Sequence, residues 1–259
     1  MTTQITTELI KELRDATGIS VMQCKNALTE AEGDMKKALA ILKKTSSDIA
    51  LKKADRNAKD GAVIIKSSNN KIALVTLRCE TDFVSKNEDF TSLLSKLSEI
   101  AFTDGIEKMK SAAKDMIDPI IQKTGENIQL DEAYIVEGAI LGSYVHNNKS
   151  AVIVSLEGGS VELAKDIAMH ITAMKPEYIN ENEISEETKT TMIEIFQKEI
   201  SAIDKPEEIK KKMLEGKIGT YFKEKTLLNQ PFIKNGDETI GQLLEKSKAK
   251  IKEVKRYSI

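Results

Sequence analysis

Apolar residues recur at helical spacing through residues 1–45, and the pattern predicts three short helices separated by Gly18 and Gly33. Residues suited to helix N-caps precede the three apolar stripes: Thr6, Ser20 and Asp34. The segment therefore predicts a small three-helix module. The polar, lysine-rich stretch 45–60 that follows is interpreted as a linker with some helical content.

Beyond Gly61 the apolar period shortens to about two residues, which indicates β-strands. Strands are expected at 63–66 and 71–79 around a Ser/Asn turn, which makes a hairpin. A polar loop, 80–86, and a helix from about 87 to 102 should follow.

A similar pattern returns about 77 residues later, which indicates an internal repeat. Three short segments correspond: Gly61-Ala62 with Gly138-Ala139, Asn69-Asn70-Lys71 with Asn147-Asn148-Lys149, and Ala73-Leu74-Val75 with Ala151-Val152-Ile153. A helix with Leu163 and Ile171 on its apolar face follows the second hairpin. The fold class is therefore predicted as α+β, with a duplicated core of two hairpin-plus-helix subdomains.

Residues 184–228 return to purely helical spacing, with a break at Asp204-Lys205-Pro206, and predict an inserted antiparallel helical hairpin. The tail predicts an extended segment at 231–233, a short helix near 239–244 and a last strand at 254–259. The chain is accordingly divided into five predicted segments: 1–55 (N-terminal module and linker), 56–137 (first core subdomain), 138–183 (second core subdomain, first part), 184–228 (helical hairpin) and 229–259 (end of the second subdomain and C-terminal module).

Composition narrows the function classes. The 259 residues hold 39 Lys and Arg against 41 Asp and Glu, with only four Arg and no Trp. This balance argues against direct nucleic-acid binding, which favours basic patches and stacking aromatics. No apolar run is long enough for a bilayer span and no secretory signal is expected. Two cysteines give no disulfide framework, so the chain is expected in the cytoplasm.

Candidate catalytic groups are few. A cysteine hydrolase could use Cys79, His146 or His170, and Asp82, but nothing local directs a base onto a thiol that closes an apolar strand. Cys24 lies on an apolar helix stripe, and His170 is expected to be a packed helix residue. His146, at a hairpin turn, stays open between plain surface and contact residue. No phosphate-binding loop or zinc motif is present, so we expect neither an enzyme nor a cofactor or metal site.

The loop Cys79-Glu80-Thr81-Asp82-Phe83-Val84 is the most informative segment. Phe83 lies in a polar stretch just beyond a strand end. Either it folds back onto the core of its own domain, or it is an exposed aromatic wedge beside the carboxylate of Asp82. Aromatic side chains dominate many interfaces, and loops at strand ends often carry binding residues.

Thr81-Asp82-Phe83-Val84, followed by Lys86 and Asn87, resembles the T-D-F-V loop of the bacterial elongation factor Ts family. Further segments along nearly the whole chain also resemble that family: Leu13-Arg14 with Thr17-Gly18, Met22 to Leu28, Gly125-Glu126-Asn127-Ile128, Leu141-Gly142-Ser143-Tyr144 with His146, Ala168-Met169-His170 with Lys175-Pro176, Gln230-Pro231-Phe232, and Gly241-Gln242-Leu243-Leu244.

The resemblance implies a ubiquitin-associated-like (UBA-like) N-terminal three-helix module, a duplicated core, a coiled-coil insertion and a short C-terminal module. It also implies a guanine-nucleotide exchange factor for elongation factor Tu, bound in its GDP and nucleotide-free states. Two sets of residues follow from it: Thr81, Asp82, Phe83 and Val84 for disturbing the Mg²⁺ and phosphate site of the GTPase, and Lys25, Thr124, Gly125, His146 and Ile233 for partner contact.

This sequence departs from the family pattern at Thr124 and Lys234, where an apolar residue is usual. The alternative function is a non-catalytic adaptor that docks a partner through the UBA-like module. Whether the helical hairpin also self-associates is left open.

Overall fold

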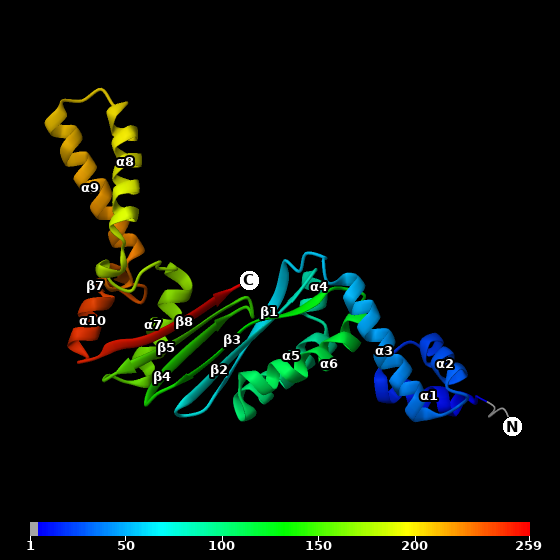
Figure 1. Ribbon diagram of the computed structural model, residues 1–259. Coiled ribbons are helices and arrows are strands. Elements are labelled where there is room, and N and C mark those ends of the chain that lie inside the picture. The colour runs from blue at the N-terminus through cyan, green and yellow to red at the C-terminus, as the bar shows by residue number, and fades with distance from the viewer. Residues whose placement is uncertain (1–4) are drawn as a thin grey trace. The chain divides into compact units, whose positions relative to one another are not determined.

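The computed structural model describes residues 5–259 and has an α+β fold, in which helices alternate with small antiparallel sheets (Figure 1). Residues 1–4 of the first predicted segment lie outside the described residues. The chain forms two compact units: Met1–Glu137 with Val145–Ala151 and Tyr257–Ile259, and Gly138–Tyr144 with Val152–Arg256. Each unit is described by itself below.

The first unit begins with three helices: α1 (Thr7–Thr17), α2 (Val21–Glu30) and α3 (Met35–Lys53). The three N-caps predicted from the sequence are confirmed, because Thr6, Ser20 and Asp34 each accept a hydrogen bond from a backbone N–H in the first turn of their helix. Leu13 and Leu28 lie at the centre of the small apolar cluster that these helices enclose.

The stretch 45–60, interpreted from the sequence as a linker with some helical content, is helical in its first part and packs against the rest of the unit. Its first part is the second half of α3, which packs against helix α6 (Ile106–Thr124). Ala50 joins the main apolar cluster of the unit, and Ser47 donates a hydrogen bond of 2.6 Å to the Asp118 carboxylate. The polar residues of this stretch therefore form the solvated face of α3. Small side chains on the opposite face of α3 allow it to pack closely against α6.

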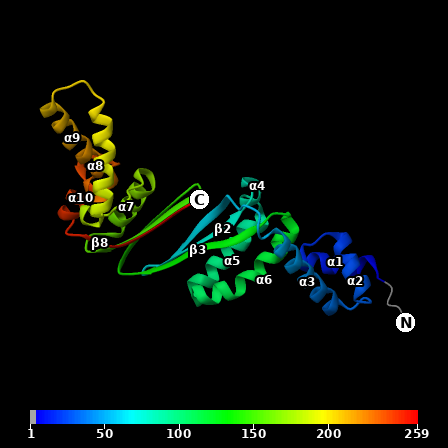
Figure 2. The same cartoon turned by 45° about the horizontal axis from the view of Figure 1, so that its top comes forward.

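The main sheet of the first unit has the order β1 (Asp60–Ser67), β2 (Lys71–Cys79), β3 (Ile128–Glu137), and all its pairings are antiparallel. Helix α5 (Glu88–Asp104) and α6 lie together on one face of this sheet (Figures 1 and 2). The hairpin and α5 match the sequence prediction, whereas α6 and β3 were not predicted. Pro119 interrupts the helical pattern of α6 in the sequence. The charged, solvent-facing positions of β3 obscure the alternation expected of a strand.

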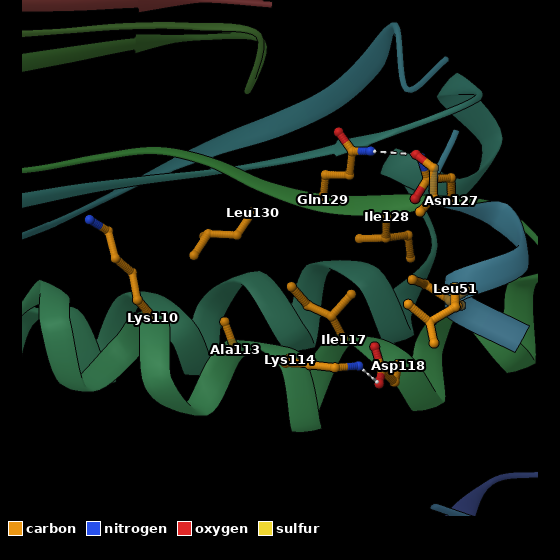
Figure 3. Close-up of a pocket in the computed structure, with 13 residues that line it drawn as sticks. Leu51, Lys110, Ala113, Lys114, Ile117, Asp118, Asn127, Ile128, Gln129 and Leu130 are labelled. Atoms are coloured by element: carbon orange, nitrogen blue, oxygen red, sulfur yellow. Dashed lines mark hydrogen bonds and ion pairs between the residues drawn. The ribbon is translucent and has the colours of Figure 1, made fainter. Parts of the chain in front are cut away.

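A groove of about 320 Å³ runs between the end of α3, α6 and the start of β3 (Figure 3). Its floor is apolar, with Ile117 and Leu130 pointing into it, and Leu51 at its edge is largely exposed. The two lysines at the rim are paired: Lys110 with Glu107 and Lys114 with Asp118. The rim is therefore charge-balanced and forms no basic binding patch.

The second sheet has the order β4 (Ile140–His146), β5 (Ser150–Glu157), β8 (Lys250–Ser258). Most of it lies in the second unit, where helix α7 (Val161–Met174) and the apolar side chains of β5 form the core. The predicted last strand is present and begins four residues earlier than expected, at Lys250. Both sheets thus have a hairpin followed by a helix, and a common origin by duplication remains a prediction.

Between α7 and β8 the chain passes through a short 3₁₀ turn η1 (Glu181–Glu183) and the antiparallel helices α8 (Glu186–Ser201) and α9 (Glu207–Lys225) (Figure 1). Phe196 of α8 meets Tyr221 of α9 edge to face, with ring centroids 5.4 Å apart. The remaining elements are η2 (Leu227–Asn229), β6 (Pro231–Phe232), β7 (Asn235–Thr239) and α10 (Ile240–Lys246).

The absence of a side chain at Gly142 allows β4 to approach α7 closely. A Cβ atom at this position would lie 2.2 Å from the backbone nitrogen of Lys165 and 2.3 Å from the carbonyl carbon of Ala164. We expect Gly142→Ala to lower the free energy of unfolding by about 3 kcal/mol, because backbone atoms cannot give way as a flexible side chain can. Gly216→Ala is the control, since its Cβ would meet open space within α9, and it should be neutral or stabilising by up to about 1 kcal/mol. Urea denaturation followed by circular dichroism measures both, and equal midpoints would contradict this packing argument.

Candidate partner-binding site

The T-D-F-V loop is a single helical turn, α4 (Asp82–Ser85), directly after β2. Thr81 is its N-cap, and its hydroxyl oxygen accepts a 3.4 Å hydrogen bond from the Val84 backbone N–H. Val84 is buried in the main apolar cluster of the first unit. Thr81 and Val84 therefore hold the turn from within, and this geometry gives both residues a structural role.

Phe83 points away from that core and is 83% exposed. The alternative in which it folds back onto its own domain is wrong, because its neighbour Val84 occupies the inward position of the turn. An aromatic ring left this exposed costs free energy in water unless something covers it. The loop therefore presents a large apolar side chain on a short, capped support.

Asp82 lies on the same turn and pairs with Lys86, at 2.7 Å between Oδ2 and Nζ. This hydrogen bond lowers the pKa of the Asp82 carboxyl and raises the pKa of the Lys86 ammonium. Because a carboxyl with a lowered pKa stays ionised at neutral pH, the loop carries an ionised carboxylate, paired with Lys86, beside the exposed ring.

Glu126 fixes the loop from one side. Its Oε2 atom accepts hydrogen bonds from the backbone N–H groups of Glu80 (3.1 Å) and Thr81 (3.0 Å), and its Oε1 atom accepts one of 2.6 Å from the Thr81 hydroxyl. A carboxylate with three such donors is a strong local anchor. Sequence reasoning did not single out Glu126, although it lies within one of the matching family segments.

Gly125 precedes this anchor and ends α6 in the left-handed region, at φ +78°. Its carbonyl oxygen accepts hydrogen bonds from Lys53 and Arg56, which tie it to α3 and the segment after it. The Thr124 hydroxyl donates to the Ile120 carbonyl at 2.8 Å. Both predicted contact residues thus have local structural roles, and the Glu126 carboxylate brings them next to the T-D-F-V loop.

Lys149 fixes the loop from the other side. Its Nζ atom donates to Asp60 Oδ1 (2.5 Å), the Gly61 carbonyl (2.6 Å) and Ser85 Oγ (3.2 Å) at the base of α4. Burial of the Asp60 carboxyl opposes its ionisation, but hydrogen bonds from Lys149 and the Gly61 N–H outweigh this and lower its pKa. Sequence reasoning used Lys149 only for the repeat and missed this contact.

The tight turn that carries Lys149 also carries His146. Asn147 and Asn148 both have positive φ, as a two-residue hairpin turn requires, and the Lys149 N–H donates to the His146 carbonyl at 2.9 Å. The His146 ring is exposed and lies 3.3 Å from the Asn147 amide nitrogen. The structure thus brings His146, the T-D-F-V loop and Gly125 to one end of the first sheet.

Two predicted contact residues lie elsewhere. Lys25 is exposed on α2, close in the chain to the exposed side chains of Val21 and Met22. Ile233 lies in the second unit, in the turn between β6 and β7, with 46% of its side chain exposed. Both side chains are open to solvent.

The catalytic alternatives find no support in the geometry. Burial raises the pKa of the Cys79 thiol to about 12, so the nucleophilic thiolate is disfavoured. Cys24 is buried in the cluster of α1 to α3, and His170 is a buried helix residue as predicted.

No group of three potential metal ligands occurs within residues 5–259. In the same part of the chain, no helix is both long and apolar enough to cross a bilayer.

The family model described as Elongation factor TS matches residues 80–259. Curated proteins named Elongation factor Ts align with almost the whole chain. That of Hahella chejuensis is 39% identical over 262 residues, covering 98% of this chain and 92% of its own length. That of Thioalkalivibrio sulfidiphilus is 38% identical over 269 residues, with coverages of 98% and 92%. That of Pseudomonas aeruginosa is 35% identical over 263 residues, with coverages of 99% and 91%.

This chain belongs to the elongation factor Ts family. The resemblance drawn from the T-D-F-V loop is thereby confirmed over nearly the full length of the chain. Within an elongation factor Ts fold, the exposed Phe83 beside an ionised Asp82 is the feature that most needs a functional explanation.

Proposed function

We propose that this chain is the guanine-nucleotide exchange factor for elongation factor Tu in translation elongation. The observation that carries the proposal is the capped, hydrogen-bonded T-D-F-V turn, which exposes Phe83 and holds Asp82 beside it. Membership of the elongation factor Ts family supports the choice of partner. The partner is bound in its GDP and nucleotide-free states, in the cytoplasm, without direct contact to nucleic acid.

The mechanism is thermodynamic coupling. A nucleotide held at roughly nanomolar Kd is bound by about 12 kcal/mol, and Mg²⁺ links its phosphates to the GTPase. A protein that binds the conformation with a disturbed Mg²⁺ site more tightly must weaken nucleotide binding by the same coupling free energy. No bond breaks, so neither a nucleophile nor a general base is required.

Each residue of the loop has a distinct part in this scheme. Phe83 inserts into the G domain of the partner, where its ring gains the apolar contacts that it lacks in the free protein. Asp82 brings a negative charge toward the Mg²⁺ and phosphate site, where it disturbs the bound ion. Thr81 and Val84 keep the turn in the shape that presents the other two.

The remaining contacts extend the interface. Gly125, Thr124 and His146 surround the loop and contact the same domain of the partner. Lys25 docks the N-terminal module, and Ile233 offers an apolar contact from the second unit. These assignments are supported by the exposure of Lys25, His146 and Ile233.

The alternative is an adaptor that binds elongation factor Tu without accelerating nucleotide release. Release of a fluorescent GDP analogue from elongation factor Tu, with and without this chain, discriminates between the two. Acceleration at substoichiometric amounts of the chain supports exchange. Complex formation on a gel-filtration column with an unchanged release rate would support the adaptor.

Cysteine chemistry offers a separate test. Changing Cys24 and Cys79 together to Ala should leave the exchange rate at saturating protein within about two-fold of the unaltered chain. Burial of both thiols means that the cost falls on stability instead, on the order of 1 kcal/mol for each site. Circular dichroism establishes that the variant is folded. A folded double variant without exchange activity would instead support a role for a cysteine as a nucleophile.

A further inference from the structure

His170 is a buried imidazole for which the exchange mechanism has no use. It lies on α7 with no exposed surface, and both ring nitrogens are engaged by one neighbouring segment of the second unit. The Ile233 backbone N–H points at Nδ1 over 3.2 Å, and Gln230 Oε1 lies 2.9 Å from Nε2. A buried polar ring held at both nitrogens is a specific arrangement rather than simple packing.

The hydrogen-bond directions follow from the donors. A backbone N–H can only donate, so Nδ1 accepts and carries no proton. The proton of the neutral ring is then on Nε2, which donates to Gln230 Oε1. The Gln230 amide group in turn donates to the Glu224 carbonyl at the end of α9, at 2.5 Å. Burial also lowers the pKa of His170, which favours this neutral form.

The segment that His170 holds is the one that exposes Ile233. Phe232 is buried beside the imidazole, with ring centroids 6.2 Å apart, whereas the next side chain along, Ile233, is 46% exposed. Lys234 completes the attachment through an ion pair of 2.7 Å with Asp166, one helical turn before His170 on α7. Two residues of α7 therefore hold this segment: His170 through the backbone N–H of Ile233, and Asp166 through the side chain of Lys234.

We infer that His170 is a positioning residue that fixes the turn after β6 through the Ile233 N–H and so presents the Ile233 side chain to a protein partner. The inference rests on the proposed function, in which Ile233 contacts elongation factor Tu. His170 itself touches no partner, because its ring is fully covered by its own unit. Its effect on binding must pass through Ile233.

Two substitutions separate the two ring nitrogens. In His170→Asn the short amide can place its oxygen near the position of Nδ1, so an acceptor for the Ile233 N–H is kept. In His170→Gln the longer amide reaches toward the position of Nε2, and the Ile233 N–H loses its acceptor. Both variants remove the ring and leave a similar void, so each serves as the packing control for the other.

The first readout needs no partner. Hydrogen exchange of the Ile233 amide, measured by NMR on the full-length protein, should be slow in the unaltered chain and in His170→Asn, and at least about 10-fold faster in His170→Gln. Thermal melting of both variants tests whether they are comparably folded. Equal exchange of this amide in both folded variants would overturn the positioning role, whatever the partner.

The second readout is affinity for elongation factor Tu·GDP by titration calorimetry. Ile233→Ala should raise Kd roughly 10-fold, as should His170→Gln, and the double variant should be no weaker than either. A roughly 100-fold loss in the double variant would show that His170 acts independently of Ile233 and would overturn the inference. An unchanged Kd for Ile233→Ala, with intact nucleotide release, would overturn the presentation of Ile233 to elongation factor Tu while leaving the proposed exchange function in place.

Discussion

Phe83→Ala should reduce stimulated GDP release from elongation factor Tu by roughly 30- to 1000-fold. An aromatic hot spot is worth about 2–4 kcal/mol when truncated, and each 1.4 kcal/mol is a factor of ten. The loss should be shared between affinity for elongation factor Tu and the maximal release rate. The fold should not change, because Phe83 contributes nothing to the core of the first unit. Stopped-flow release of a fluorescent GDP analogue, with titrated exchange factor, measures both quantities.

Leu51→Ala is the matched control for this prediction. Leu51 is 68% exposed in the same unit, at the edge of the groove between α3 and α6, and it has no part in the proposed interface. Leu51→Ala should leave the affinity for elongation factor Tu and the maximal release rate within about two-fold of the values of the unaltered chain. Equal losses for Leu51→Ala and Phe83→Ala would indicate a general surface effect, and full activity of Phe83→Ala would remove the wedge from the mechanism.

Glu126→Ala should have the second-largest effect. The carboxylate accepts two backbone N–H bonds and one hydroxyl bond at the base of the T-D-F-V loop. Its removal leaves the N–H groups of Glu80 and Thr81 without acceptors, so we expect a loss of about 3 kcal/mol in the free energy of unfolding. If the loop is then correctly shaped about a tenth of the time, apparent affinity for elongation factor Tu falls about 10-fold.

The control for Glu126→Ala is Glu107→Ala, at a side chain 90% exposed in the first turn of α6. It should change stability by less than about 0.5 kcal/mol and leave exchange unaltered. Urea denaturation and the release assay together test the pair. Full stability and full activity of Glu126→Ala would mean that the loop holds its shape without this anchor.

Local signals made the helical caps and the first hairpin predictable. Thr6, Ser20 and Asp34 cap their helices because a short polar side chain before an apolar stripe has few other uses. Asn87 caps α5 for the same reason, through the Asp89 N–H at 2.8 Å. Where one residue type and one position decide a conformation, a single sequence is sufficient.

Elements stabilised by distant packing were missed. Helix α6 contains Pro119, which normally ends a helix, and its position depends on packing against α3 and α5. Strand β3 pairs with β2 across about 50 residues of chain, and its exposed positions carry polar or charged side chains. No local pattern reports such contacts. The division into five segments remains a prediction, although the sequence placed the helical hairpin and the last strand close to where they occur.

In the candidate site, too, one feature could be predicted from the local sequence and others depend on distant contacts. Phe83 could be singled out because an aromatic side chain in a polar loop lacks an obvious packing partner. The supports of the loop could not, since Glu126 and Lys149 reach it from other elements. The family motif includes the loop itself, whereas the hydrogen bonds that hold it are evident only from the structure.

The proposed action of Asp82 on the Mg²⁺ site of elongation factor Tu can be tested through the Mg²⁺ dependence of GDP release with Asp82→Ala. GDP release from elongation factor Tu should be measured by stopped flow with the unaltered chain and with Asp82→Ala, first at millimolar free Mg²⁺ and then with the ion chelated. We expect slower release by the variant at millimolar Mg²⁺, with little change in affinity, and a smaller difference in release rate after chelation because the ion is already gone. Equal release by both proteins at millimolar Mg²⁺, or a difference that persists unchanged without Mg²⁺, would contradict the claim that Asp82 acts on the metal site.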